Sequence, residues 1–112
     1  MRTLTLDDLL GFNAAVSEEY GQQSVVINEN NLQSALSNQS SYYETDEQAA
    51  CAVFRSIIIG HGFQDGNKRT AVLAIHYMLP PTVDVNTVAD VAISCAKGEL
   101  KEVGDIVALL YS

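Results

Sequence analysis

The chain has 112 residues, of which 6 are Lys or Arg and 14 are Asp or Glu, so its formal net charge is −8. This length predicts a single domain over residues 1–112 with one hydrophobic core. The acidic excess argues against direct binding to nucleic acid or anionic membranes, so a phosphate ligand needs a local basic patch. No apolar run approaches the length of a membrane span and no signal-peptide core follows the first residues, which leads us to expect a cytoplasmic protein.

The first third of the chain predicts two helices separated by a short extended run. Thr5 has capping-box spacing to Asp8 and opens a helix that ends near Gly21. Asn28 then caps a short second helix. The β-branched run between them is too brief for a helix and predicts one arm of a β-hairpin, formed by Val25, Val26 and Ile27.

A third helix is predicted at the centre of the chain. It follows a loop of Ser, Asn and Tyr at residues 37–43, begins after Thr45 with a capping box to Gln48, and runs to about Ile59. Most of its sides are apolar, which predicts burial in the middle of a bundle. Gly60 suits a left-handed C-cap for this helix.

The second half of the chain predicts three more helices. An apolar segment from Ala71 to Leu79 stops at Pro80, because proline lacks the amide hydrogen that a helix needs. Two further stretches repeat apolar residues at helical spacing, and they contain Val88, Val91, Ala92 and Cys95, then Val103, Ile106, Val107 and Leu110. The chain as a whole therefore predicts an all-α bundle of about six helices with a small β-hairpin flap.

Several chemically versatile residues are better explained as parts of the core. Cys51 and Cys95 lie in apolar helical patterns, which predicts buried thiols rather than a disulfide or a nucleophile. Phe63 is expected to anchor the loop between the two central helices. His76 lies in an apolar helix without an acidic neighbour and is expected to be a hydrogen-bonded core histidine.

The segment between the two central helices, from His61 to Ala71, concentrates the remaining reactive side chains. It is not a Walker loop, because Asn67 separates Gly66 from Lys68. It is not a calcium loop either, because the positions that need Gly and Glu hold other residues.

Part of this segment predicts an anion site. A helix that opens at Gly66 and Asn67 leaves its first backbone amides free at the positive end of the helix dipole. Lys68 and Arg69 supply positive charge beside them. The segment therefore predicts a cradle for phosphate groups.

The other reactive residues of the segment fit transfer chemistry. Asp65 is a hard oxygen ligand suited to Mg²⁺ that bridges phosphates, and His61 can take a proton from an attacking hydroxyl. Each residue taken singly has an ordinary role as a turn, cap or surface residue. Their occurrence together favours phosphoryl or nucleotidyl transfer.

The order of these residues resembles the motif of the Fic/Doc superfamily, which reads His, any, Phe, any, Asp or Glu, Gly or Ala, Asn, Gly or Lys, Arg. The matching residues are His61, Phe63, Asp65, Gly66, Asn67, Lys68 and Arg69. Lys68 occupies the eighth motif position, where Fic enzymes that transfer AMP carry Gly, and Val72 stands where those enzymes carry a second Arg. Both features resemble the Doc, or death-on-curing, toxin branch.

The resemblance implies a kinase toxin that transfers the γ-phosphate of ATP to a Ser or Thr hydroxyl of a translation factor such as elongation factor Tu, and so inhibits protein synthesis. It implies that His61 is the general base and that Asp65 binds Mg²⁺. The phosphates are then held by Gly66, Asn67, Lys68 and Arg69. The run Val25–Ile27 falls where the family has its target-docking flap, which can receive an extended peptide by strand pairing.

Two positions depart from the family pattern and two other functions stay open. Gly62 replaces the Pro that is common after the motif His, and Ile59 replaces a frequent basic residue. The nearest match to the inhibitory motif of Fic enzymes, at residues 40–44, is incomplete and misplaced, so we expect restraint by a separate antitoxin. The alternatives are transfer of AMP or another nucleotide to a protein hydroxyl, and a non-enzymatic module that binds a nucleotide or partner.

Overall fold

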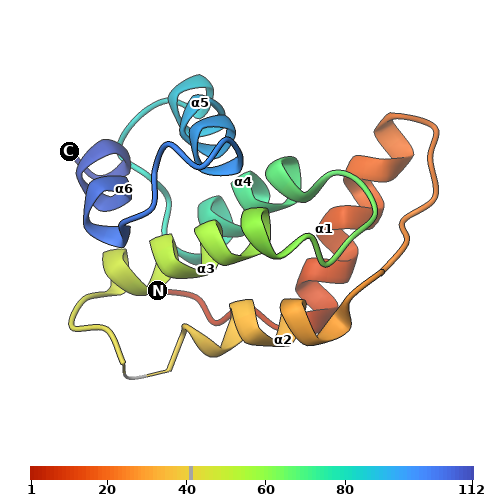
Figure 1. Ribbon diagram of the computed structural model, residues 1–112, viewed down its shortest axis with the longest axis horizontal. Helices are drawn as coiled ribbons and strands as arrows, with labels where there is room; N and C mark the ends of the chain where they lie inside the picture. The colour runs from red at the N-terminus through yellow and green to blue at the C-terminus, as the bar shows by residue number, and fades with distance from the viewer. Residues whose placement is uncertain (41) are drawn as a thin grey trace.

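Six helices account for the regular secondary structure of residues 1–40 and 42–112, which this computed structural model describes (Figure 1). They are α1 (Leu6–Glu19), α2 (Glu29–Ser37), α3 (Asp46–Gly60), α4 (Asn67–Met78), α5 (Val85–Ala96) and α6 (Val103–Leu110). The predicted all-α fold of about six helices is confirmed. None of the helices in these residues is long and apolar enough to cross a membrane.

The first three helices begin where their capping residues predict. Thr5 and Asp8 form a capping box on α1, with the Asp8 amide 3.1 Å from Thr5 Oγ1 and the Thr5 amide 2.9 Å from Asp8 Oδ2. Thr45 and Gln48 form the same arrangement on α3, and the side chain of Asn28 caps α2. Residue 41, within the predicted loop at 37–43, lies outside the described residues.

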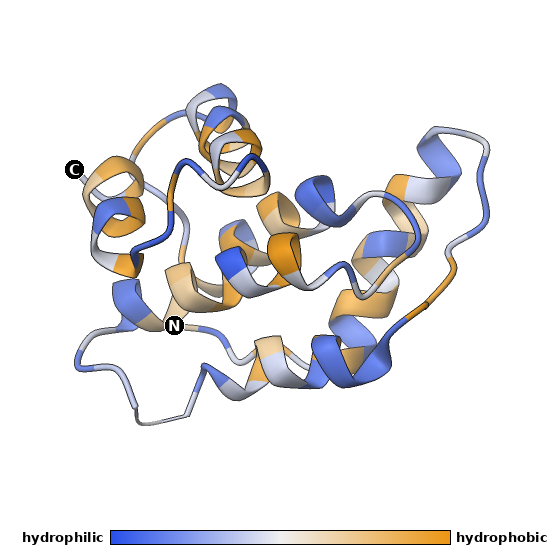
Figure 2. Ribbon diagram, in the orientation of Figure 1, coloured by the Kyte–Doolittle hydropathy of each residue, from blue (hydrophilic) through white to orange (hydrophobic). Residues whose placement is uncertain are grey.

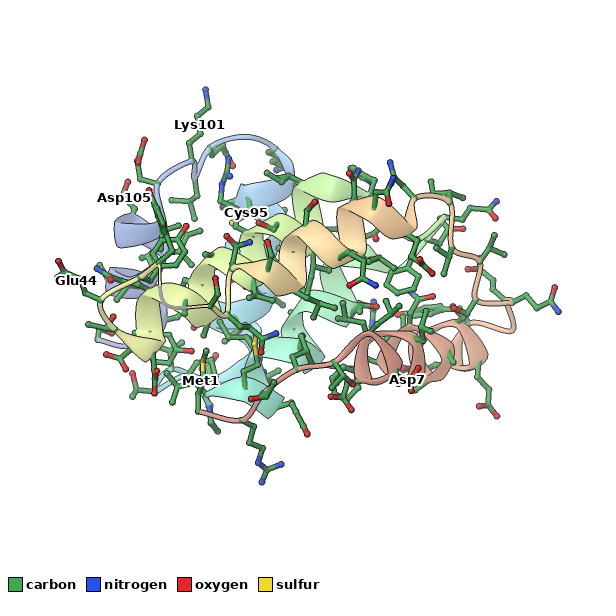
Figure 3. The ribbon with its side chains drawn as sticks, turned by 90° about the horizontal axis from the view of Figure 1, so that it is seen from below. Met1, Asp7, Glu44, Cys95, Lys101 and Asp105 are labelled. Carbon is green, nitrogen blue, oxygen red and sulfur yellow. The ribbon has the colours of Figure 1, made fainter. Side chains whose placement is uncertain are left out.

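The core is centred on α3 and α4. Helix α3 contacts α2, α4, α5 and α6, while α4 also packs against α1 and α5 (Figure 1). The apolar residues of α3 from Ala49 to Phe54, with Ile57 and Ile58, are buried as the sequence predicts, whereas Ile59 is exposed. Hydropathy colouring shows hydrophobic residues along this helix (Figure 2). In Figure 3, Glu44, Lys101 and Asp105 project outward, whereas Cys95 lies among the helices. Helices α3 and α4 therefore form the centre of the bundle and hold both ends of the loop between them.

The predicted β-hairpin is absent from the described residues. Val26 instead forms an isolated antiparallel bridge with Phe63 in the loop between α3 and α4. The Ile27 amide donates to the Gly62 carbonyl at 2.9 Å, and the Gln64 amide donates to the Val25 carbonyl at 2.8 Å. The hairpin prediction is wrong because the chain enters α2 directly after Asn28, and the extended run pairs with the motif loop instead.

The end of α3 also differs from the prediction. Gly60 is the last helical residue, and His61 adopts the left-handed conformation with φ 47°. A Cβ on Gly60 would lie 3.4 Å from Asn31 Cβ, and Asn31 Nδ2 donates to the Gly60 carbonyl at 2.7 Å. The left-handed turn therefore falls at His61, one residue later than predicted, and Asn31 of α2 holds the Gly60 carbonyl.

Both cysteines are buried free thiols, as predicted, and the one on α3 makes stability depend on pH. Burial, with a smaller contribution from neighbouring Cys95 and Glu47, raises the pKa of the Cys51 thiol from 9.0 to about 12. In the folded state the Cys51 thiol thus keeps its proton at a pH at which the same thiol in the unfolded chain loses it. We expect the free energy of unfolding to fall between pH 9 and pH 12, with a contribution from this thiol of up to about 1.4 kcal/mol per pH unit.

Urea unfolding of wild type and Cys51→Ala across that range measures the contribution. The variant should be less stable at neutral pH and should show the shallower alkaline slope, because it has one fewer group to ionise on unfolding. Equal slopes would contradict the assignment.

Candidate anion-binding site

The loop between α3 and α4 is closed by Asn67 and Phe63. Phe63 is fully buried, which confirms its predicted role as the apolar anchor. Its amide donates to Asn67 Oδ1 at 3.1 Å, and Asn67 Nδ2 donates to its carbonyl at 2.9 Å. The side chain of Asn67 therefore fixes the shape of the loop, and its backbone amide remains available at the start of α4.

Gly66 is required where α4 begins. Its φ of 78° lies in the left-handed region, and an added Cβ would lie 3.0 Å from Val16 Cγ1 and 3.3 Å from Asn13 Nδ2. No side chain caps this helix, and its first backbone hydrogen bond is donated by Thr70 to the Gly66 carbonyl at 2.9 Å. The amides of residues 67–69 are left without an acceptor in the described structure, at the positive end of the helix dipole.

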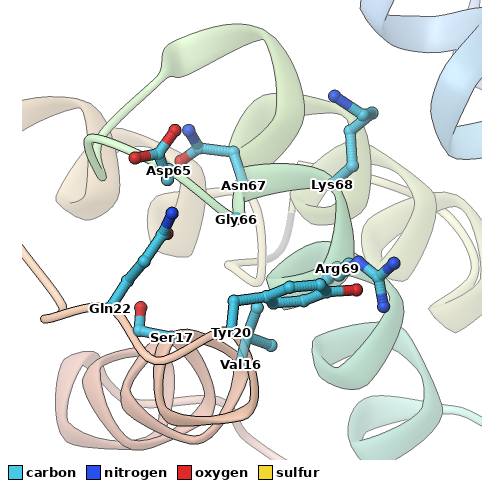
Figure 4. A pocket seen from close by; sticks show the side chains of 9 residues that line it. All are labelled: Val16, Ser17, Tyr20, Gln22, Asp65, Gly66, Asn67, Lys68 and Arg69. Atoms are coloured by element: carbon cyan, nitrogen blue, oxygen red, sulfur yellow. The ribbon is translucent and has the colours of Figure 1, made fainter.

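A pocket of about 200 Å³ lies in front of these amides. Residues Asp65 to Arg69 line one wall, and the C-terminal part of α1 with the segment that follows it lines the other (Figure 4). The second wall consists of Val16, Ser17, Tyr20 and Gln22. The structure therefore brings together the predicted Asp65, Gly66, Asn67, Lys68 and Arg69.

The charges at this pocket favour an anion. Lys68 and Arg69 are exposed, and the Arg69 guanidinium lies 4.6 Å from the centre of the Tyr20 ring, in a cation–π contact. Within the described part of the chain, the only ion pair joins the N-terminus to Asp46, so neither Lys68 nor Arg69 is held in a direct ion pair. In a chain with a net charge of −8, they form the local basic patch that a phosphate requires.

His61 does not line this pocket. It is exposed at the end of α3, on the other side of the loop from Gly66, and its ring has no hydrogen-bond partner among the described residues. Its neighbour Gly62 is held in place, because the Gly62 carbonyl accepts hydrogen bonds from the amides of Ile27 and Asn28, at 2.9 and 3.1 Å. The extended run that contains Ile27 thus fixes the backbone beside His61, while the His61 ring remains accessible to a ligand.

Gly62 itself is a packing requirement. An added Cβ would lie 2.5 Å from Leu32 Cγ and 3.2 Å from the Asn28 carbonyl oxygen. Leu32 is 1% exposed and belongs to the core. The absence of a side chain at position 62 therefore lets α2 pack directly against the motif loop.

The residues of α1, and of the segment that follows it, that contribute to the site were not predicted. Asn13 is fully buried, and Ser17, Tyr20 and Gln22 face the loop (Figure 4). One signal in the sequence could have indicated Asn13, since it follows the buried Leu9 by four residues and so falls on the apolar face of α1. The others become visible only when α1 is packed against α4.

A larger groove adjoins the pocket. It has a volume of about 490 Å³, lies beside α4 and α5, and shares Val16, Lys68 and Arg69 with the smaller pocket. Its walls are mainly apolar and include Val72 together with the exposed Leu73, Val85 and Ile93. The charged side chains that line this groove are those of Lys68, Arg69 and Glu19.

The site does not contain a complete set of protein ligands for a metal. The residues described hold no group of three or more His, Cys, Asp or Glu side chains that could bind a metal ion. Asp65 contributes the one carboxylate that lines the pocket. The residues present fit a Mg²⁺ ion that arrives with phosphates, because Mg²⁺ is commonly bound by one or two carboxylates together with phosphate oxygens and water.

A comparison with known families identifies the chain. The Fic/DOC family matches residues 3–79, a range that includes α1 to α4, the motif loop and every residue that lines the smaller pocket. No curated protein and no solved structure gave a significant match. Members of the family are typically transferases that modify proteins. Because the matched range is more than half of the sequence, the chain belongs to the Fic/Doc family.

Proposed function

We propose that this protein is a Doc-like kinase that transfers the γ-phosphate of ATP to a Ser or Thr hydroxyl of a translation factor resembling elongation factor Tu, and so inhibits protein synthesis. The observation that carries the proposal is the pocket at the start of α4, with free backbone amides and Lys68 at its edge. Family membership supports a transferase that acts on proteins. Lys68 and Val72, at positions where enzymes that transfer AMP have Gly and Arg, support the kinase branch.

In this proposal the phosphates of ATP lie in the pocket. The amides of residues 67–69 donate to phosphate oxygens, and Lys68 and Arg69 offset their charge. Asp65 would hold Mg²⁺ that arrives with the phosphates, and the ion would supply positive charge to offset the charge that develops during transfer. These contacts stabilise the transferring group electrostatically and orient it for in-line attack.

His61 acts as the general base. The substrate hydroxyl oxygen forms a bond to the γ-phosphorus, the bond from that phosphorus to the β–γ bridging oxygen breaks, and ADP leaves with that electron pair. The hydroxyl proton passes to a ring nitrogen of His61. The exposure of His61 outside the pocket suits a protein substrate, whose hydroxyl enters between the ring and the bound phosphate.

The extended run at Val25–Ile27 is proposed to hold the substrate. One edge of this run pairs with the motif loop, while the backbone N–H and C=O of Val26 have no partner in the residues that the structure describes. The side chains of all three residues are exposed. A substrate segment added as a strand on this open edge would lie close to the motif loop.

The groove beside α4 and α5 is proposed to receive the antitoxin. Exposed Leu73, Val85 and Ile93 offer an apolar surface for a helix, and Lys68 and Arg69 at one end favour an acidic residue on it. Because the groove shares these two cations with the pocket, a bound antitoxin would compete with ATP. A translation factor as substrate places the activity in the cytoplasm.

Labelled ATP tests the proposal. Purified protein, Mg²⁺ and elongation factor Tu are incubated with ATP labelled at either the γ- or the α-phosphate. Label from the γ-position alone on a Ser or Thr of the factor is the expected result. Label from the α-position indicates nucleotidyl transfer instead, and ATP binding without label on any protein of a translation extract indicates a non-enzymatic binding module.

A further inference from the structure

Asn13 joins three segments of the chain beside the anion pocket. It is fully buried in α1, with 0% of its surface exposed. Its Nδ2 donates to the Asp65 carbonyl at 2.9 Å and to Thr70 Oγ1 at 3.1 Å. Its Oδ1 accepts from Ser24 Oγ at 2.5 Å and from Ser17 Oγ at 3.4 Å.

These contacts reach both ends of the proposed catalytic machinery. Asp65 and Thr70 lie on either side of the first turn of α4, so the amide of Asn13 fixes the turn that presents the free backbone amides. Ser24 directly precedes Val25–Ile27, so its hydrogen bond to the side-chain Oδ1 of Asn13 holds the start of that run in place. Gly66 allows this approach, since its missing Cβ would lie 3.3 Å from Asn13 Nδ2.

Packing alone does not explain why a polar side chain with these hydrogen bonds stands at position 13. An apolar side chain at position 13 would fill the same space beside Leu9 and Val16, whereas a buried amide costs free energy unless its hydrogen bonds are made. No buried side-chain nitrogen or oxygen in the described residues lacks a partner. Apart from the longer contact with Ser17 in α1 itself, the hydrogen bonds of this amide are therefore directed at the motif loop, α4 and the segment that leads into Val25–Ile27.

We infer that Asn13 is a positioning residue that sets the anion-binding turn through Asp65 and Thr70 and the substrate-docking run through Ser24. The inference rests on the proposed function for the roles of those two segments. Its consequence is that the two halves of the network affect different ligands. Loss of the Thr70 contact weakens nucleotide binding, whereas loss of the Ser24 contact weakens binding of the protein substrate.

Single contacts are removed one at a time, because Asn13→Asp buries a carboxylate and can unfold the chain. We expect Thr70→Val to weaken binding of MgATP roughly fivefold, the effect of one hydrogen bond, and Thr70→Ser to restore it to within about twofold. We expect Ser24→Ala to leave MgATP binding unchanged and to raise KM for the protein substrate with little change in kcat. Equal weakening by Thr70→Val and Thr70→Ser would overturn the inference, as would a lower kcat without a change in KM for Ser24→Ala.

Amide hydrogen exchange of the free protein separates this inference from the proposed function. Ser24→Ala should accelerate exchange at Ile27 and Asn28, whose amides bond to the loop, and Thr70→Val should accelerate it at the amide of residue 70, which donates to the Gly66 carbonyl in the first turn of α4. If wild type binds no MgATP, the proposed function fails, and the exchange rates still decide whether Asn13 orders both segments. Unchanged exchange in both variants would overturn the positioning role.

Discussion

Replacing His61 with Asn is expected to reduce phosphate transfer by roughly 10²- to 10⁴-fold, the usual contribution of a general base. The folded state should survive, because Asn adopts the left-handed conformation more readily than other residues with a side chain. His61 has φ 47° and its exposed ring makes no hydrogen bond within the described structure, so no hydrogen bond is lost. We expect the free energy of unfolding to stay within about 0.5 kcal/mol of wild type or to rise.

His61→Ala provides the matched comparison. It removes the same ring but keeps an ordinary side chain in the left-handed conformation, so its stability should fall below that of His61→Asn. Both variants should have equally low transfer rates with γ-labelled ATP and equal affinity for MgATP, since His61 does not line the anion pocket. A variant that retains the wild-type transfer rate would exclude His61 as the base.

The second large effect is expected at Gly62, where an Ala should lower the free energy of unfolding by about 1–3 kcal/mol. The added Cβ would lie 2.5 Å from Leu32 Cγ, and Leu32 is too buried to move away. Urea or thermal unfolding measures the loss. Gly11→Ala is the control, because no atom lies within 4 Å of its added Cβ, and Ala in that helix should be neutral or stabilising.

A double-mutant cycle with Leu32 tests the cause. Leu32→Ala alone should cost about 2–5 kcal/mol, as expected for truncation of a buried leucine. In that background Gly62→Ala should cost less, because the colliding Leu32 atoms are gone and only the 3.2 Å approach to the Asn28 carbonyl oxygen remains. Additive losses would show that the steric conflict between these two residues is not what destabilises the single variant.

The helices could be predicted from the sequence because their signals are local. Thr5, Asn28 and Thr45 each cap a helix through a residue three positions later, so a few neighbouring side chains decide where α1, α2 and α3 begin. The hairpin could not be predicted correctly, because Val26 pairs with Phe63, which is distant in the chain. The left-handed turn was placed one residue too early, at Gly60, because glycine is the usual residue in that conformation, whereas His61 adopts it here.

The same distinction between local and long-range signals applies to the candidate site. Asp65 to Arg69 were predicted together because they are contiguous and one turn brings them to one pocket. His61 is just as close in sequence but lies at the opposite end of the loop, so proximity along the chain did not place it in that pocket. Tyr20 and Gln22 were missed because their part in the site depends on how α1 packs against α4.

The support of the motif loop from the first third of the chain has a consequence for protein engineering. Val26 pairs with Phe63, Leu32 fills the space beneath Gly62, and Val16 abuts Gly66. A fragment limited to α3, the loop and α4 keeps every residue of the motif but none of these three contacts. The nine-residue motif therefore cannot be transferred by itself. If it is moved onto another pair of helices, the N-terminal segment has to be moved with it.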